Sequence, residues 1–241
     1  MTRVVRAIDL GRQPYLPVLE LQRRLVGARI DNEISEDLLL IVEHDPVVTL
    51  GRGTRQTSLP LPEPVLRERG FEVVEVERGG DVTVHAPGQL VGYPIIDLQQ
   101  HRPDLHWYLR QLEEAMIRGL GALGIVADRN PGRTGVWVGG RKIGSIGVHV
   151  KRWVTLHGFA LNVTTDLRMF NVVVPCGIDG VIMTSVEREI VSSSDRLIVL
   201  SLWDATRAAV LDGFAAAFDV EIVAGSLPML SDGPAVHSPD R

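Results

Sequence analysis

The chain has 241 residues, of which 45% are apolar and 23% are charged, and its formal net charge at pH 7 is −5. A chain of this length and composition can bury a sizeable core and is ordinary for a globular protein. The negative net charge argues against a nucleic-acid-binding protein. One cysteine cannot form an intrachain disulfide, the N-terminus lacks a signal-peptide core, and no apolar run is long enough to span a membrane. We therefore expect a cytoplasmic protein that is not embedded in a membrane.

The first hundred residues predict one helix and then a series of strands, because the apolar periodicity changes from helical spacing to continuous or alternating runs. We expect a helix over 14–33, a buried central strand over 37–43 and a short strand over 47–50. A proline-rich surface loop that could contain a short helix follows over 54–69, and then strands over 71–77, 81–85 and 90–96.

Residues 103–124 give the strongest helix signal. Asp104 can cap the N-terminus of this helix, and Gly124 can end it. One face of the helix collects apolar side chains at spacings of three and four, namely Leu105, Leu109, Leu112, Met116, Leu120 and Leu123.

The second half of the chain predicts a group of strands followed by helices. Strands are expected over 125–127, 135–138, 142–150 and 154–162, a helical turn over 166–170, a short helix over 184–190, a long helix over 195–218 and a last strand over 221–223. Gly139-Gly140 predicts a hairpin turn. The pattern indicates an α+β protein with a mixed or largely antiparallel sheet and flanking helices. We expect one domain over residues 1–225, followed by a polar tail over 226–241.

The only cysteine, Cys176, lies between a proline and a glycine after three valines. Proline restricts the backbone on both sides, and glycine leaves room for a tight turn, so this loop could present a reactive thiol. A lone cysteine can equally be a small buried hydrophobe. The residues around it leave both interpretations open.

Lys142 opens a strand in which Gly144 and Gly147 suggest close approach by a ligand or by another backbone segment. If this lysine points towards Cys176, its charge favours the thiolate over the thiol. The alternative is a solvated lysine on a strand. A second cluster of glycines, at 79 and 80, follows Arg78 and can hold oxygen atoms of a ligand, although this is a weak signal by itself.

Polar residues inside apolar strands form a further group of candidates. His157 and Asn162 lie in one such strand and require buried partners. His85 ends another strand, where histidines are more often structural than catalytic. No recognisable metal-ligand spacing is present, so we expect no metal site.

Basic residues are concentrated between residues 129 and 162, a stretch that contains no Asp or Glu. Such a local field could attract an anionic ligand or an acidic protein, or it could be the solvated face of a strand. The basic residues are Arg129, Arg133, Arg141, Lys142, Lys151 and Arg152.

Four blocks of sequence, in this order and spacing, resemble the octanoyltransferases of lipoate biosynthesis. The likeness runs from about residue 37 to residue 190, and Ala86 stands where that family is expected to have glycine. The blocks are Arg78–His85 with Pro87–Gln89 and Tyr93–Ile95, then Arg141–Ile143 with Ile146–Gly147, then Leu156–Asn162, and finally Pro175–Ile178.

This resemblance implies the fold of lipoate and biotin protein ligase catalytic domains, and it implies no cofactor. It also implies that octanoyl is transferred from octanoyl-acyl carrier protein to a lysine of lipoyl domains of 2-oxoacid dehydrogenases or of the glycine-cleavage H protein. Cys176 would carry the acyl group as a thioester, and Lys142 would lower the pKa of that thiol and act as acid and base. The residues implied to bind substrate are Arg78, Gly79, Gly80, Asp81, Val82, Thr83, Val84, His85, Ser145, Ile146, Gly147, Gly158, Phe159 and Ala160.

Two other functions remain open on the sequence. An ATP-dependent lipoate or biotin ligase could share the fold but would need no nucleophilic cysteine. A non-catalytic module could bind an acyl group or a carrier protein without turning it over.

Overall fold

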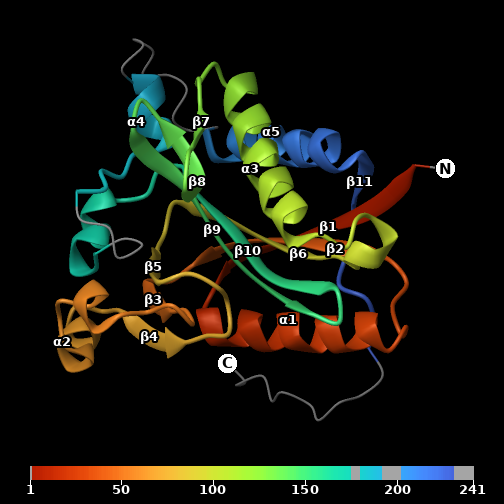
Figure 1. Ribbon diagram of the computed structural model, residues 1–241, viewed down its shortest axis with the longest axis horizontal. Coiled ribbons are helices and arrows are strands. Elements are labelled where there is room, and N and C mark those ends of the chain that lie inside the picture. Colours follow the sequence, from red (N-terminus) through yellow and green to blue (C-terminus); the bar gives the residue numbers. More distant parts are fainter. Residues whose placement is uncertain (1, 175–179, 192–201, 231–241) are drawn as a thin grey trace.

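The computed structural model describes residues 2–174, 180–191 and 202–230. Its larger sheet has eight strands in the spatial order β11-β1-β2-β6-β10-β9-β8-β7 (Figure 1). These strands are β1 (Arg3–Gln13), β2 (Asp37–His44), β6 (Gln89–Ile95), β7 (Asp128–Asn130), β8 (Arg133–Val138), β9 (Arg141–Lys151), β10 (Val154–Asn162) and β11 (Val220–Ala224).

The large sheet is mixed, as the sequence predicts. Strand β1 pairs in parallel with both β2 and β11. From β2 onwards, each successive pair in the order β2-β6-β10-β9-β8-β7 is antiparallel. The predicted central strand is confirmed, because β2 is buried along nearly its whole length between two layers of helices.

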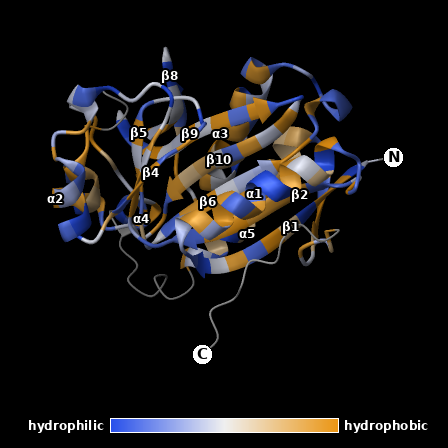
Figure 2. Ribbon diagram, turned by 90° about the horizontal axis from the view of Figure 1, so that it is seen from below, coloured by the Kyte–Doolittle hydropathy of each residue, from blue (hydrophilic) through white to orange (hydrophobic). Residues whose placement is uncertain are grey.

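Helices cover both faces of the large sheet. Helices α3 (Leu105–Ala122) and α5 (Leu202–Phe218) pack on one face, and α1 (Tyr15–Ile30) packs on the other (Figure 1). Successive side chains of a strand point to opposite faces. Accordingly, Leu39 and Ile41 join the α3–α5 core, whereas Leu38 and Leu40 join the α1 core. Along α1, hydrophilic residues alternate with hydrophobic ones (Figure 2), which suits a helix packed on one side only.

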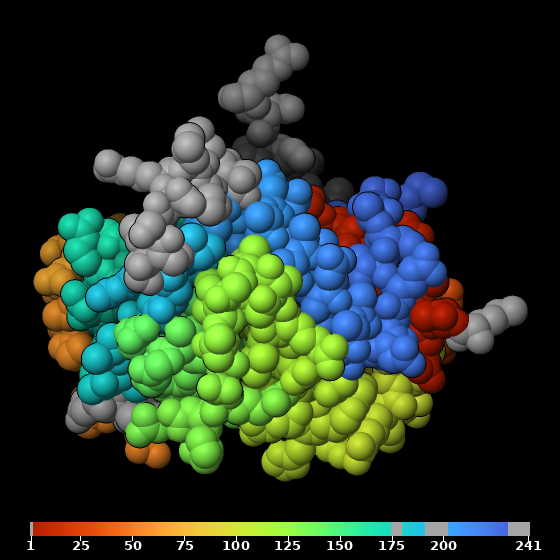
Figure 3. Space-filling view, turned by 90° about the horizontal axis from the view of Figure 1, so that it is seen from above, coloured from red at the N-terminus to blue at the C-terminus, as the bar shows by residue number. Residues whose placement is uncertain are grey.

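Helices α3 and α5 lie side by side (Figure 3). The contact is close because a Cβ atom at Gly213 would lie 2.3 Å from the carbonyl oxygen of Ala115. The predicted cap of α3 is confirmed, since the Asp104 carboxylate accepts a hydrogen bond from the backbone N–H of Trp107. No helix among the residues that the structure describes is long and apolar enough to cross a membrane.

A second, three-stranded sheet packs beside one end of the large sheet. It contains β4 (Glu72–Glu75), β3 (Val47–Leu50) and β5 (Val82–His85), with β3 in the middle. Helix α2 (Glu63–Glu68) and the 3₁₀ helix η3 (Leu167–Val172) enclose its core. Ala86 is fully buried in this core, so its methyl group is accommodated at the position where the related family is expected to have glycine.

Two elements differ from the sequence prediction. Strand β1 was not expected, because the arginines and the aspartate of Arg3–Gln13 obscure any apolar alternation; only a few of its residues are buried. The strand expected over 125–127 is wrong. Ile125 and Ala127 do face the core while Val126 is 83% exposed, but strand pairing begins only at Asp128. The long helix expected from residue 195 is described from Leu202 onwards.

The remaining helices are short. The chain forms the 3₁₀ helices η1 (Gln56–Ser58) and η2 (Leu98–Gln100). Helix α4 (Val186–Val191) overlaps the short helix that the sequence predicts over 184–190.

Candidate active site

A cavity of about 240 Å³ lies where the small sheet meets the β8–β10 part of the large sheet. Lys142 and twelve of the fourteen residues predicted to bind substrate line it: Arg78, Gly80, Asp81, Val82, Thr83, His85, Ser145, Ile146, Gly147, Gly158, Phe159 and Ala160. Two predicted residues do not line the cavity. Val84 packs into the core of the small sheet, and the backbone N–H of Gly79 is bonded to the carbonyl oxygen of Val148.

One wall of the cavity is the pair β9–β10, where Ser145 lies opposite Ala160 and Gly147 lies opposite Gly158. A Cβ atom at Gly147 would lie 2.8 Å from Cδ of Arg78, and one at Gly158 would lie 2.1 Å from the carbonyl oxygen of Gly92. The close approach that the glycines predict is therefore real, and the approaching groups belong to the protein itself.

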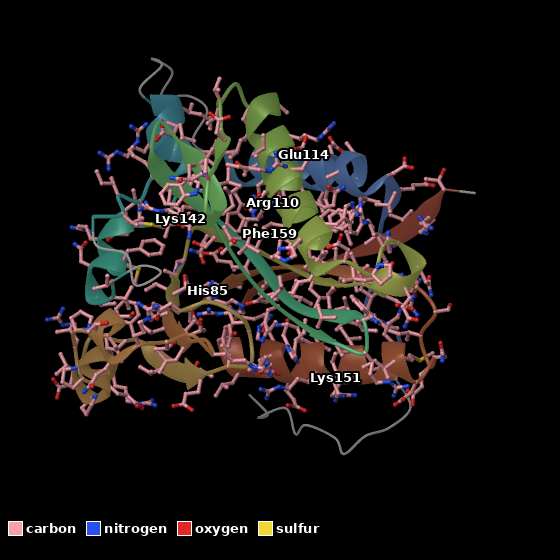
Figure 4. All side chains as sticks on the ribbon, viewed as in Figure 1. His85, Arg110, Glu114, Lys142, Lys151 and Phe159 are labelled. Atoms are coloured by element: carbon pink, nitrogen blue, oxygen red, sulfur yellow. The ribbon has the colours of Figure 1, made fainter. Side chains whose placement is uncertain are left out.

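Lys142 is buried, with 2% of its surface exposed, so the interpretation as a solvated lysine is wrong. It comes from the start of β9, and Figure 4 shows it on the same side of the molecule as His85 and Phe159. Its Nζ lies 5.7 Å from the centre of the Trp137 ring. Gly135 makes room for its side chain, because a Cβ there would lie 2.9 Å from Cε of Lys142.

Cys176 lies outside the described residues, but the chain on either side of it is described. On one side, the backbone N–H of Val174 is bonded to the carbonyl oxygen of Ser58, whose hydroxyl donates to the carboxylate of the cavity residue Asp81. On the other side, Val181 lines the cavity, and the carbonyl oxygen of Ile182 accepts from the backbone N–H of Lys142. Of the described residues that flank Cys176, Val181 therefore lines the cavity, and Val174 is bonded to Ser58, a partner of the cavity residue Asp81.

The guanidinium of Arg78 is buried and is used to shape the cavity wall. Nη2 donates to the carbonyl oxygen and to the hydroxyl of Thr49, at 2.7 and 2.9 Å. Nη1 donates to the carbonyl oxygens of Gly79 and Asp81, at 3.1 and 2.6 Å. These bonds hold the loop that contains Gly79 and Gly80 against β3. The Nη1 and Nη2 donors of Arg78 are therefore used within the protein.

His85 is the end of a chain of hydrogen bonds that fixes its tautomer. Asn162 donates its Nδ2 to the carbonyl oxygen of Thr184, so its Oδ1 is free to accept from Nε2 of Gln89. Oε1 of Gln89 then faces Nδ1 of His85 at 2.8 Å, and Nδ1 must carry the proton. Burial, assisted by the nearby His44, lowers the pKa of His85 to about 3, so the ring is neutral and Nε2 is an acceptor.

A second histidine is fixed in the same way beneath the cavity. Nδ1 of His44 donates to the carbonyl oxygen of Gln13, so its Nε2 accepts from the hydroxyl of the cavity residue Tyr93. Burial lowers the pKa of His44 to about 4. Tyr15, at the start of α1, stacks on His85 with ring centroids 5.8 Å apart. The wall therefore contains neutral rings with defined hydrogen-bond directions.

His157 is the strained residue of the site. Its φ of +61° lies in the left-handed region in the middle of β10, and its backbone N–H leaves the ladder to donate to Oε1 of Gln22. Backbone strain of this kind is common at functional sites. Neither ring nitrogen of His157 is hydrogen-bonded, and Nε2 lies 3.7 Å from the carboxylate of Glu77.

Residues 14–199 match the lipoyl protein ligase A/B catalytic domain family. The chain belongs to this family. An octanoyltransferase of Nostoc sp. (strain PCC 7120) is 53% identical over 168 residues, which are 70% of this chain and 75% of that protein. An octanoyltransferase of Acidobacterium capsulatum is 49% identical over 201 residues, which are 78% of this chain and 81% of that protein. These relationships make the chain an acyltransferase.

Solved structures confirm the lipoate-ligase fold of this family member. A bi-partite lipoate protein ligase from Thermoplasma acidophilum superposes with a TM-score of 0.67 at 17% identity, over 94% of this chain and 88% of that chain. A lipoate-protein ligase A bound with ATP superposes with a TM-score of 0.66 at 18% identity, over 95% and 90% of the two chains.

The basic stretch of this lipoyl protein ligase A/B family member does not form one free surface. Arg129 is bonded to Glu113 and Glu114 of α3, and Arg141 makes a two-pronged ion pair with Glu189. Lys151 lies at the far end of β9 from Lys142 (Figure 4). Of the six basic residues in this stretch, Lys142 and Arg133 line the cavity. The guanidinium of Arg133 lies 5.9 Å from the centre of the Trp137 ring.

Eight cavity residues are not among those that the resemblance implies to bind substrate, although His157 and Arg133 are candidates on other grounds. They are Tyr15, Tyr93, Gly132, Arg133, Thr134, Trp137, His157 and Val181. The polar position of His157 inside an apolar strand signals a special role, but nothing in the sequence connects Tyr15 with residues that lie 60 or more positions away. Within the described part of the chain, no group of three or more His, Cys, Asp and Glu residues could hold a metal ion.

Proposed function

We propose that this acyltransferase moves octanoyl from octanoyl-acyl carrier protein to a lysine of a lipoyl domain, through a thioester on Cys176. The observation that carries the proposal is the burial of Lys142 in the cavity wall, where its backbone N–H is bonded to Ile182 and the neighbouring Val181 lines the cavity. The octanoyltransferase name of relatives about 50% identical supports the choice of acyl group.

The cavity suits an acyl chain. Ile146, Phe159 and Val82 give it apolar walls, and polar groups are few and fixed in direction. Pockets that are largely apolar and carry a small number of oriented polar groups are typical of small-molecule sites. The octanoyl chain would lie along β9–β10 with its carbonyl carbon near Lys142.

The chemistry proceeds in two transfers. The Cys176 thiolate attacks the thioester carbonyl of the donor, and the carrier's phosphopantetheine thiolate leaves and takes a proton. The neutral amine of the acceptor lysine then attacks the acyl-cysteine, the C–S bond breaks, and the proton lost by nitrogen is available to the departing sulfur. Lys142 serves both steps, because its ammonium favours the thiolate and its amine can accept the proton from the incoming nitrogen.

The decisive experiment is to incubate the protein with octanoyl-acyl carrier protein and to measure the intact mass. We expect one octanoyl adduct on Cys176 that is discharged when a lipoyl domain is added, and no adduct on Cys176→Ser. The absence of an adduct on the wild type would refute the covalent route. Full transfer by Cys176→Ser would refute it as well, and binding without turnover would leave only the non-catalytic module.

An ATP-dependent ligase remains the second candidate, because a lipoate-protein ligase A bound with ATP shares the fold. A ligase would label the lipoyl domain when given octanoate and ATP, whereas a transferase requires the acyl carrier protein thioester. We expect no labelling with octanoate and ATP.

We propose that the acidic carrier protein docks on the cavity rim through Arg133 and Arg52. Both are exposed, and the backbone N–H of Arg52 is bonded to the carbonyl oxygen of Arg78. Arg133→Glu and Arg52→Glu should slow acyl loading at low salt, because opposite charges steer association. Lys151→Glu is the matched control, since Lys151 is distant from the cavity; equal slowing by this control would refute the docking surface.

The acceptors proposed are lipoyl domains of 2-oxoacid dehydrogenases and the glycine-cleavage H protein. We propose residues 1–225 as the catalytic unit, because the last strand of the large sheet ends at Ala224, and residues 226–241 as a tail.

A further inference from the structure

Thr184 is a fully buried threonine whose three polar groups each bind a different part of the site. Its backbone N–H donates to the carbonyl oxygen of Lys142 at 2.9 Å. Its carbonyl oxygen accepts from Nδ2 of Asn162 at 3.0 Å. Its hydroxyl donates to the carboxylate of Glu189. A buried side chain satisfied in this way is fixed in direction as well as in place.

The first branch from Thr184 fixes Lys142. The Lys142 peptide is clamped on both sides, since its N–H donates to the carbonyl oxygen of Ile182 at 2.8 Å while its C=O accepts from Thr184. Lys142 and Met183 form an isolated parallel bridge as a result. The segment that follows residues 175–179 is thereby bound to the backbone of the lysine.

The second branch, from the Thr184 hydroxyl, connects Thr184 to Arg141 through Glu189. Glu189 accepts from the Thr184 hydroxyl and also from Nε and Nη2 of Arg141, the residue next to Lys142. Burial alone would raise the pKa of Glu189, but the bonds from Arg141 and Thr184 outweigh it and hold this pKa below its usual value. Glu189 is therefore ionised, and its charge strengthens the bond that the hydroxyl donates.

The third branch leads to His85. From the carbonyl oxygen of Thr184, the bonds run through Asn162 and Gln89 to Nδ1 of His85. A single residue thus joins a cavity lysine on β9 to a cavity histidine on β5, in two different sheets.

We propose that Thr184 is a positioning residue for acyl transfer, which holds Lys142 and His85 in one geometry relative to each other. This proposal rests on the proposed function. The influence of the Lys142 ammonium on the thiol falls with the distance between them, so release of the clamp weakens it. The charged groups described near Lys142 include Arg133, across the Trp137 ring, together with Arg141 and Glu189. They also include the buried Glu113 of α3, whose carboxylate accepts from the backbone N–H of Gly135 beside the Lys142 side chain.

The test is the pH dependence of Cys176 alkylation by iodoacetamide, read by intact mass. The chain has one cysteine, so every adduct reports on it. Thr184→Val keeps the shape and removes the hydroxyl. We expect the wild-type thiol to titrate below about 8.5 and the variant to titrate about one pH unit higher, which makes alkylation at pH 7 about tenfold slower.

Two control variants accompany it. Thr184→Ser restores the hydroxyl and should restore the wild-type titration. Thr206→Val removes the hydroxyl of an equally buried threonine on α5, one that makes no hydrogen bond, and it should leave the titration unchanged. If Thr184→Val does not fold, Glu189→Gln tests the same clamp from its other side and should raise the titration midpoint by less.

The outcomes distinguish a failure of the positioning role of Thr184 from a failure of the proposed octanoyl transfer. A lowered wild-type midpoint that stays the same in Thr184→Val and Glu189→Gln would overturn the role of Thr184 and leave the proposed function standing. An ordinary thiol midpoint in the wild type, with no octanoyl adduct, would overturn both. A shift confined to the Thr184→Val and Glu189→Gln variants, with slower octanoyl transfer, supports the positioning role.

Discussion

Replacement of Arg78 by lysine tests whether this arginine shapes the cavity wall. The guanidinium donates to three carbonyl oxygens and one hydroxyl, spread over Thr49, Gly79 and Asp81. A lysine keeps the charge, but its three donors radiate from one nitrogen and cannot span these acceptors. At least two of these acceptors would lose their partner, and the two on Thr49 are buried.

The expected magnitude follows from that number. Each unsatisfied buried acceptor costs about 1–3 kcal/mol, so Arg78→Lys should lower the free energy of unfolding by about 2–6 kcal/mol. That is a large share of the 5–15 kcal/mol, roughly, that stabilises a typical domain. With a urea m-value of about 2 kcal/mol/M, the denaturation midpoint should fall by about 1–3 M.

The assay is urea denaturation followed by circular dichroism, with octanoyl loading measured on the same samples. Arg24→Lys is the matched control, because Arg24 is an exposed arginine on α1, and it should change the free energy by less than about 0.5 kcal/mol. An Arg78→Lys protein that kept the wild-type midpoint and loading rate would show that these four bonds do not hold the loop.

Three further predictions follow from the packing and the histidines. Gly135→Ala would force a Cβ to within 2.6 Å of the carbonyl oxygen of Gly144 and 2.9 Å of Cε of Lys142, so transfer should fall by about 100-fold in a steady-state assay. Gly213→Ala should lower the free energy of unfolding by about 1–3 kcal/mol, whereas Gly121→Ala, which meets nothing within 4 Å, should change it little; thermal melts compare them. The pKa of His44 falls from 6.5 to about 4 on folding, so below pH 6.5 the unfolded chain binds more protons than the folded one. The free energy of unfolding should therefore decrease as the pH falls from 6.5 to 4. His44→Gln should reduce this slope by up to about 1.4 kcal/mol per pH unit, as measured by urea titrations at pH 7 and pH 5.

The sequence predicts most elements of the fold because local signals agree with tertiary context. The apolar run at 37–43 is continuous and becomes β2. Leu112, Met116 and Leu120 of the apolar face predicted over 105–123 are buried in α3, whereas Leu105, at its first turn, is exposed. Strand β1 could not be predicted in this way. Its backbone is held by pairing with β2 and with β11, which lies over 200 residues away, while its side chains are largely polar.

In the site, too, local sequence patterns predict some features, and contacts between distant residues create the others. Glycine-rich blocks mark the cavity wall, since glycines are needed where β10 passes close to the backbone of β6 and where β9 passes close to Arg78. The partnerships that give the wall its chemistry are not local. Thr184 carries no signal in the sequence, and it becomes notable only because folding brings it between Lys142, Asn162 and Glu189.

The fixed directions of the polar groups bear on the choice between transfer and ligation. A site that activates an acid with ATP must offer donors to phosphate oxygens, and an arginine beside two glycines is an obvious source. Here Arg78 donates instead to Thr49, Gly79 and Asp81, and His85 presents an acceptor. Arg78 is therefore less available to a triphosphate than an uncommitted arginine would be. The commitment of Arg78 agrees with the octanoyltransferase names of the relatives.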